Sequence, residues 1–169
     1  MAKSPRYTVR YRRKREIKTD YNLRLKLLKS RSNRLIIRRS IKYFTLQLVK
    51  YEVNGDRVLN TVTSKELPKL GWKFSTSNIP AAYLSGLLMA KKSKEKDAIA
   101  DFGLNRLVKG GALYAALKGA IDGGMKINHS KEIFPKEDRI KGEHIKNYGK
   151  NKEDIVKNFE EVKNKILKM

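Results

Sequence analysis

Cationic and aromatic side chains alternate at the start of the chain, and this combination suits contact with nucleic acid. Two Arg-Tyr pairs precede four consecutive cations, and the whole run consists of Arg6, Tyr7, Arg10, Tyr11, Arg12, Arg13, Lys14 and Arg15. Cations neutralise phosphates and release counterions, which supplies most sequence-independent affinity. Tyrosine rings can stack on unpaired bases, at roughly 1–3 kcal/mol per base, and arginine can fork onto phosphate or guanine. The alternatives are a solvated tail, a targeting signal or a solubilising arm, because a basic run alone is compatible with each.

A second group of cations follows, where an expected short helix leads into the first expected strand. Its members are Arg24, Lys26, Lys29, Arg31, Arg34, Arg38, Arg39 and Lys42. From this segment we expect the RNA-binding site to include Tyr21, Arg24, Lys29, Arg31, Arg34 and Arg38. A basic amphipathic helix could instead lie on a membrane surface. The apolar stripe of Tyr21, Leu25 and Leu28 is narrow for that purpose and no lipidation motif accompanies it, so the pattern favours nucleic acid.

Acidic and glycine-rich motifs later in the chain give little support for catalysis. Asp101-Phe102-Gly103 matches the metal-binding tripeptide of protein kinases, but the chain is too short for a kinase and lacks its other loops. Gly110 and Gly111 lack the Gly-Lys-Ser/Thr ending of a phosphate-binding loop. Asp101 and Asp122 could share a metal, yet nothing places further carboxylates beside them. A metal-dependent nuclease and a membrane-surface protein therefore remain alternatives to a non-catalytic RNA-binding protein.

The histidines and the largest aromatic residues also have simple structural interpretations. His129 and His144 lie 15 residues apart in a chain without cysteine, so a metal site is not expected. We expect His144 to make an ordinary polar contact, and Trp72 and Tyr83 to be core residues rather than platforms for bases. The sequence thus predicts no metal, no cofactor and no small-molecule substrate.

Charge is distributed unevenly along the chain. The 169 residues contain 40 Lys and Arg against 17 Asp and Glu, a net charge of +23. Residues 1–42 alone contain 16 Lys and Arg against 2 Asp and Glu, so they supply +14 of the excess. This imbalance indicates a polyanionic partner for a basic N-terminal arm. No cysteine, no apolar run of about 18 residues and no secretory leader is present, so we expect a soluble intracellular protein without disulfides.

Hydrophobic periodicity predicts the elements that must position these side chains. After a cap at Thr19-Asp20 we expect a short helix, then three strands in an antiparallel meander at 35–37, 43–53 and 57–63, with a turn at 54–56. A helix capped by Ser77 or Asn78, a strand at 99–102 and a helix at 113–121 follow, and two charged helices at 137–148 and 151–168 complete the series. The last helix has Ile155, Phe159, Val162 and Ile166 as its apolar stripe.

This order predicts an α/β fold, with a small, mostly antiparallel sheet and helices packed on it. We expect a basic RNA-binding extension with a short helix at 1–32, an α/β core domain at 33–130 and a charged helical C-terminal extension at 131–169. Residues 1–18 are expected to be extended and disordered when free, because they cannot bury enough apolar surface to offset the entropy of ordering.

Many short motifs in one order resemble a single family. In chain order they are Pro5-Arg6-Tyr7, Arg12-Arg13-Lys14-Arg15-Glu16, Thr19-Asp20-Tyr21, Arg24-Leu25, Leu27-Leu28-Lys29-Ser30, Arg34-Leu35, Gln47-Leu48-Val49, Gly71-Trp72, Asn78, Pro80-Ala81-Ala82-Tyr83-Leu84, Gly86-Leu87-Leu88, Asp101, Gly103-Leu104-Asn105, Gly119-Ala120-Ile121-Asp122, Arg139, Gly142, His144-Ile145 and Tyr148. Over residues 5–148 the chain resembles the archaeal type of the universal L-eighteen family of large-subunit ribosomal proteins, whose eukaryotic counterpart is called L-five. Residues 149–169 match no motif of that family.

The resemblance implies a structural constituent of the large ribosomal subunit that binds 5S rRNA and anchors it in the central protuberance. It implies no catalytic activity and a cytoplasmic location in the ribosome. The implied partners are 5S rRNA, 23S-type rRNA and neighbouring ribosomal proteins, including the universal large-subunit protein five. By position, the RNA-wrapping extension would contain Arg6, Tyr7, Arg10, Arg12, Arg13, Arg15, Tyr21 and Arg24. We expect the free arm to fold along the RNA while the core docks as a rigid body.

Overall fold

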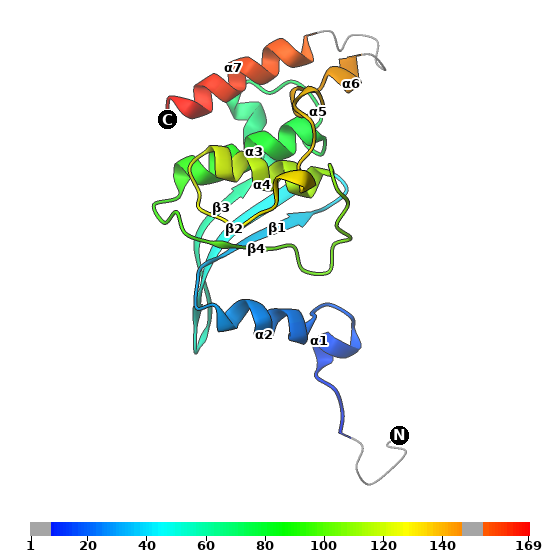
Figure 1. Ribbon diagram of the computed structural model, residues 1–169, viewed down its shortest axis with the longest axis vertical. Coiled ribbons are helices and arrows are strands. Elements are labelled where there is room, and N and C mark those ends of the chain that lie inside the picture. The colour runs from blue at the N-terminus through cyan, green and yellow to red at the C-terminus, as the bar shows by residue number, and fades with distance from the viewer. Residues whose placement is uncertain (1–7, 147–153) are drawn as a thin grey trace.

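The computed structural model describes residues 8–146 and 154–169, and its centre is a four-stranded sheet with the order β3-β2-β1-β4 (Figure 1). The strands are β1 (Arg34–Arg39), β2 (Phe44–Glu52), β3 (Gly55–Thr63) and β4 (Ile99–Asp101). The first three form an antiparallel meander, and β4 pairs with β1 in parallel. The expected α/β fold with a small, mostly antiparallel sheet is confirmed.

The alternation of residues along β1 separates the two faces of the sheet. Leu35 and Ile37 are fully buried and lie opposite Leu48 and Leu46 of β2 in the strand register. Because successive side chains of a strand point to opposite faces, the residues between them, such as Ile36, point the other way. One face of the sheet is therefore apolar, and the other carries mixed polar and apolar side chains.

Two helices, α3 (Ile79–Lys92) and α4 (Ala112–Asp122), cover the apolar face (Figure 1). Asn78 caps α3, since its side-chain oxygen accepts from the backbone N–H of Ala81 at 2.9 Å. The two helices touch through glycines: a Cβ at Gly86 would lie 1.9 Å from the carbonyl oxygen of Ala116, and a Cβ at Gly119 would lie 2.0 Å from that of Tyr83. Any side chain at either glycine would force the helices apart.

A third layer is formed by the last helix, α7 (Ile155–Leu167), which packs on the side of α3 that faces away from the sheet (Figure 1). The expected apolar stripe is confirmed, because Ile155, Phe159, Val162 and Ile166 are all buried. These four residues belong to one continuous hydrophobic core with the residues of α3 and the sheet. The charged C-terminal segment thus contributes its apolar face to the core.

The single helix expected at 137–148 is wrong. The segment forms two short helices, α5 (Glu137–Lys141) and α6 (Glu143–Lys146), and residues 147 and 148 lie outside the described part of the chain. Gly142 separates them with a φ of +90°, a conformation that glycine adopts without strain. The remaining short elements are the 3-10 helices η1 (Ser64–Leu70) and η2 (Lys131–Ile133).

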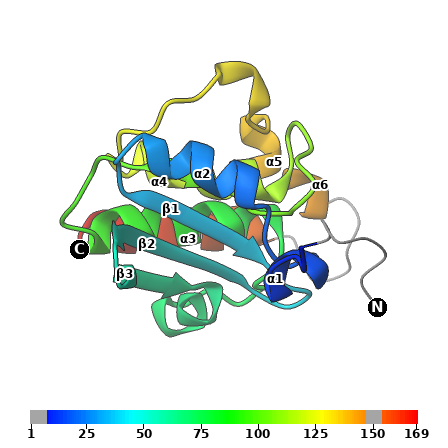
Figure 2. The same ribbon diagram turned by 90° about the horizontal axis from the view of Figure 1, so that it is seen from below.

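The basic N-terminal elements lie on the opposite side of the sheet from α3 and α4 (Figures 1 and 2). They are α1 (Arg12–Arg15) and α2 (Tyr21–Lys29). The expected cap is confirmed, because Asp20 accepts from the backbone N–H groups of Asn22 at 2.9 Å and Leu23 at 3.1 Å. An extended conformation through residues 1–18 is wrong at α1, which forms a helical turn, and residues 1–7 lie outside the described part.

Candidate nucleic-acid interface

Residues 8–31, here called the hook, fold back on themselves between α1 and α2. The rings of Tyr11 and Tyr21 lie 5.5 Å apart and are tilted by 39°. Nε of Arg13 donates a hydrogen bond to the hydroxyl of Thr19 at 2.8 Å. Ile17 turns the chain between the helices with a φ of +51°, which is unusual for a β-branched residue. Local contacts thus fix the direction of the basic segment relative to α2.

Nine cations of the hook are exposed to solvent, and one of them, Lys18, is paired with Glu16 at 2.8 Å. We call the other eight the hook cations: Arg10, Arg12, Arg13, Lys14, Arg15, Lys26, Lys29 and Arg31. Within the described residues, Arg12 alone among them has an ion pair, with Glu16 at 3.5 Å on the surface. Exposed pairs of that kind contribute little to stability. The charge of the hook is therefore available to an incoming polyanion. Tyr11 lies among these cations and is 74% exposed.

The orientation of α2 differs from the expected one. The expected stripe contained Leu25, but this side chain is 56% exposed on the outer side of the helix. Leu23, Arg24 and Leu27 instead face the sheet, where they line a hollow between α2 and the strands. Leu23 and Leu27 are four residues apart, as are Tyr21 and Leu25, so both pairs fit the period of a helix. In a helix of nine residues, hydrophobic periodicity alone therefore does not decide which side faces the sheet.

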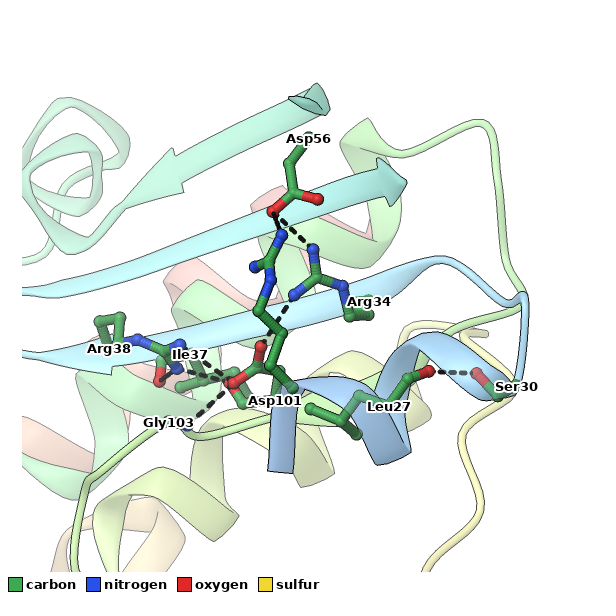
Figure 3. A network of polar contacts seen from close by, with 9 residues as sticks. Leu27, Ser30, Arg34, Ile37, Arg38, Asp56, Asp101 and Gly103 are labelled. Carbon is green, nitrogen blue, oxygen red and sulfur yellow. Dashed lines mark hydrogen bonds and ion pairs between the residues drawn. The ribbon is translucent and has the colours of Figure 1, made fainter. Parts of the chain in front are cut away.

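Alternating charges connect α2 to the sheet in what we call the arginine–aspartate network: Arg24, Asp56, Arg34, Asp101 and Arg38. Figure 3 shows Asp56, Arg34, Asp101 and Arg38 of this network. One carboxylate oxygen of Asp56 lies 3.0 Å from Nη2 of Arg24 and 2.7 Å from Nη2 of Arg34. Asp101 lies 3.3 Å from Nη1 of Arg34 and 3.0 Å from Nη2 of Arg38. The network links α2 with β1, β3 and β4.

Arg34, one of the expected RNA-binding residues, lies inside the network rather than on the surface of the protein. Its side chain is 2% exposed and lies between the two carboxylates, so it cannot reach a phosphate outside the protein. Arg38 keeps partial access, with 41% of its side chain exposed. It also donates to the carbonyl oxygen of Asp101 at 2.7 Å.

The environment of Asp56 favours its ionised form. Burial on its own would raise the pKa of Asp56, but hydrogen bonds and charge from Arg34 and Arg24 outweigh this and lower the pKa below its ordinary value. Asp56 is partly exposed, whereas Arg34 is buried, so loss of Asp56 would leave the buried guanidinium of Arg34 with Asp101 as its remaining carboxylate partner. The network therefore has the character of a structural device that fixes the hook against the sheet.

The carboxylates considered for metal binding have protein partners. Asp101 accepts from Arg34 and Arg38 and also from the backbone N–H of Gly103 at 2.9 Å. Asp122 accepts a hydrogen bond from the hydroxyl of Tyr83 at 2.8 Å. In the part of the chain that the structure describes, no group of three or more His, Cys, Asp or Glu residues could hold a metal ion.

Trp72, Tyr83 and His144 all have buried atoms in the structure. Trp72 and Tyr83 are buried, so their expected place in the core is confirmed. His144 differs, because its Nδ1 is buried and has no hydrogen-bond partner among the described residues. Burial, followed by the charge of Arg139, lowers the pKa of His144.

A hollow of about 320 Å³ lies between the hook and the polar face of the sheet. The hook contributes Arg13, Lys18 and the inner side of α2, while the sheet contributes Ile36, Gln47, Arg34 and Arg38. The sequence by itself indicates no RNA-binding role for Lys18 or for Gln47, although Gln47 begins one of the family motifs. Lys18 lies between α1 and α2 and Gln47 lies on β2, so only the packing of the hook on the sheet brings them together.

The expected RNA-binding residues thus fall into separate groups. Arg10, Tyr11, Arg12, Arg13, Lys14, Arg15, Tyr21, Lys29 and Arg31 lie in the hook. Arg24, Arg34 and Arg38 are engaged by carboxylates, while Arg6 and Tyr7 lie outside the described residues. Among the described helices, none is long and apolar enough to cross a membrane.

Comparison with known proteins points in one direction. A family model described as ribosomal large subunit proteins 60S L5 and 50S L18 matches residues 5–100. The large ribosomal subunit protein uL18 of Methanoregula boonei is 48% identical, with 99% of this chain and 98% of the relative covered. The uL18 proteins of Korarchaeum cryptofilum and Methanothrix thermoacetophila are 48% and 45% identical. The comparison with Korarchaeum cryptofilum covers 91% of this chain and 80% of the relative. The comparison with Methanothrix thermoacetophila covers 99% of each.

Proposed function

The chain belongs to the family of ribosomal large subunit proteins 60S L5 and 50S L18, and from this premise we propose that it binds 5S rRNA and anchors it in the central protuberance. A structural role in the large ribosomal subunit follows from the family itself. The observation that carries the finer proposal is the group of eight exposed hook cations on the side of the sheet away from α3 and α4.

The proposed binding mechanism is electrostatic attachment by the hook followed by docking of the core. Each hook cation that meets a phosphate releases counterions, which gives affinity without sequence preference. Tyr11 and Tyr21 add aromatic surface on which unpaired bases can stack. Residues 1–32 would form the RNA-binding extension, including Arg6 and Tyr7. The α/β core then fixes the register of the hook on the RNA.

Selectivity would come from the shape of the RNA and from its unpaired bases. The major groove of A-form RNA is deep and narrow, so side chains cannot read its base edges. A rigid core with a basic hook on one side instead recognises a folded backbone of matching shape. We place the protein in the cytoplasmic ribosome, with 23S-type rRNA and the universal large-subunit protein five as further partners.

A competition experiment tests the proposal. The purified full-length chain is incubated with 5S rRNA from an archaeal ribosome and an excess of an unrelated folded RNA of equal length. We expect retention of 5S rRNA to persist, because shape adds selectivity to the shared electrostatic affinity. Equal retention of both RNAs would leave a basic protein without 5S specificity and would overturn the proposal.

A further inference from the structure

The hollow between α2 and the sheet has the size of a site for a small molecule. Its volume of about 320 Å³ lies at the lower end of the roughly 300–1,000 Å³ typical of ligand sites. We propose that it receives one unpaired base of the bound RNA. This inference rests on the proposed RNA-binding function and adds to it a site that recognises a single nucleotide.

The charge of the lining favours a base over a bare phosphate. The network holds three arginines against two aspartates, so most of its cationic charge is already neutralised. Lys18, at the rim, lies 2.8 Å from Glu16. A phosphate inside the hollow would therefore meet cations that have carboxylate partners, apart from Arg13, which has none among the described residues. A neutral planar base needs no excess of charge, and guanidinium groups are among the surfaces on which unpaired bases stack.

The walls offer the two kinds of contact that a base requires. Leu23, Leu27 and Ile36 provide apolar surface for its faces. Gln47 provides an amide that donates to the hydroxyl of Thr61 at 3.3 Å. A primary amide has two donor hydrogens and an acceptor oxygen, so this bond leaves capacity for the edge of a base.

The polar wall also contains a donor without an acceptor. Nε of Arg34 is buried and has no hydrogen-bond partner in the residues that the structure describes. A buried donor of this kind costs free energy until an acceptor reaches it. Bases carry ring nitrogens and carbonyl oxygens that accept hydrogen bonds, whereas an apolar ligand would leave the donor unpaired.

The hollow adjoins the surface of the hook. Arg13 belongs to the hook cations and also lines the hollow, so a strand of RNA held by the hook passes its mouth. Leu104, on the loop that follows β4, lines another part and is half exposed. A base turned out of the strand can enter from the surface that binds the backbone.

Chemical footprinting of the complex between the full-length chain and 5S rRNA tests the proposal. Hydroxyl radicals report protection of the RNA backbone, and base-specific reagents report protection of base edges. In the wild type we expect one unpaired nucleotide to become protected at its base edge. Gln47→Leu should abolish that protection and weaken affinity by roughly tenfold or less, as expected for one lost hydrogen bond, with the backbone footprint unchanged.

Thr45→Val is the matched control, because Thr45 lies two residues along the same strand and is not part of the lining. It should keep the base protection. Equal loss of base protection in both variants would overturn the base site while leaving backbone binding intact. The same conclusion would follow if no base in the wild-type complex were protected in a way that Gln47→Leu abolishes. Absence of any backbone footprint would overturn RNA binding itself, and the base site with it.

A second measurement needs no substitution. Methyl NMR of the same complex should show nuclear Overhauser contacts between Leu27 and base protons of one nucleotide. Leu25, on the outer side of the same helix, is the internal control. Contacts from Leu25 with none from Leu23, Leu27 or Ile36 would show that RNA passes outside the hollow and would overturn the proposal.

Discussion

Arginines of the hook and arginines of the network lie within the same N-terminal quarter of the chain but have opposite surroundings. Arg10, Arg13 and Arg15 are exposed, and in the described residues none of them has a carboxylate at ion-pair distance. Arg24 and Arg34 share Asp56. A cation that already has a carboxylate partner offers little to a phosphate. Charge counted along a sequence therefore overestimates the charge available to RNA.

The largest expected effect comes from removing the centre of the network. Arg34→Ala should lower the free energy of unfolding by about 2–5 kcal/mol, because a fully buried side chain is removed and the buried Asp101 keeps the partly exposed Arg38 as its ion-pair partner. Chemical denaturation measures the change. The control Arg15→Ala removes an exposed hook cation and should stay within about 0.5 kcal/mol of the wild type. Similar losses for both variants would erase the distinction between the two groups.

The hook should show the opposite behaviour. Replacing Arg12, Arg13 and Arg15 together by alanine should reduce the salt dependence of 5S rRNA binding by about three units, one for each phosphate contact. The free energy of unfolding should change by less than about 1 kcal/mol, because the contacts of these residues are exposed. Titrations at several salt concentrations and denaturation curves measure the two quantities. A destabilised protein with an unchanged salt slope would show that these arginines stabilise the fold instead of binding phosphate.

Acid should weaken the network in a predictable direction. The pKa of Asp56 is lowered in the folded protein, so its ionised form contributes stability above the unfolded-state pKa of 3.8. That contribution is lost as the pH falls through the folded-state pKa. The stability difference between wild type and Asp56→Asn should be largest near about pH 6 and should shrink toward about pH 3. A constant difference across urea denaturations in this range would contradict the paired state of Asp56.

The smallest effect is expected at the outer end of the network. Arg24→Ala removes a partly exposed ion pair and should cost about 0.2–1 kcal/mol of unfolding free energy. It should reduce the salt slope of RNA binding by less than one unit, because Asp56 already neutralises Arg24. A slope change as large as that of Arg13→Ala would place Arg24 among the residues that bind phosphate.

Local patterns in the sequence predict much of the fold. Residues close together in the sequence predict the alternation along β1 and β2, the cap at Asn78 and the apolar stripe of α7. The structure confirms each of these features. Gly142 ends α5 in a left-handed C-cap, a local signal that hydrophobic periodicity does not contain. Long-range packing restricts the same position, because a Cβ there would lie 3.1 Å from Pro80 and 3.3 Å from Ile155.

The candidate site is less predictable than the fold because its parts meet across the sheet. The exposed hook cations are visible in the sequence as a basic run. The partners of Arg34 lie 22 and 67 positions away, on β3 and β4, and only the strand register brings them together. For the same reason Gln47 has no recognisable role until α2 is seen above it.

The salt dependence of 5S rRNA binding tests most directly whether the hook cations carry the affinity. Equilibrium binding is measured for the full-length chain and for a chain without residues 1–18. If about eight cations meet phosphates, the logarithm of the binding constant should fall against the logarithm of salt concentration with a slope of roughly −6. Most of that slope should disappear in the shortened chain. A flat response in the full-length chain, or an unchanged slope after the deletion, would contradict the account.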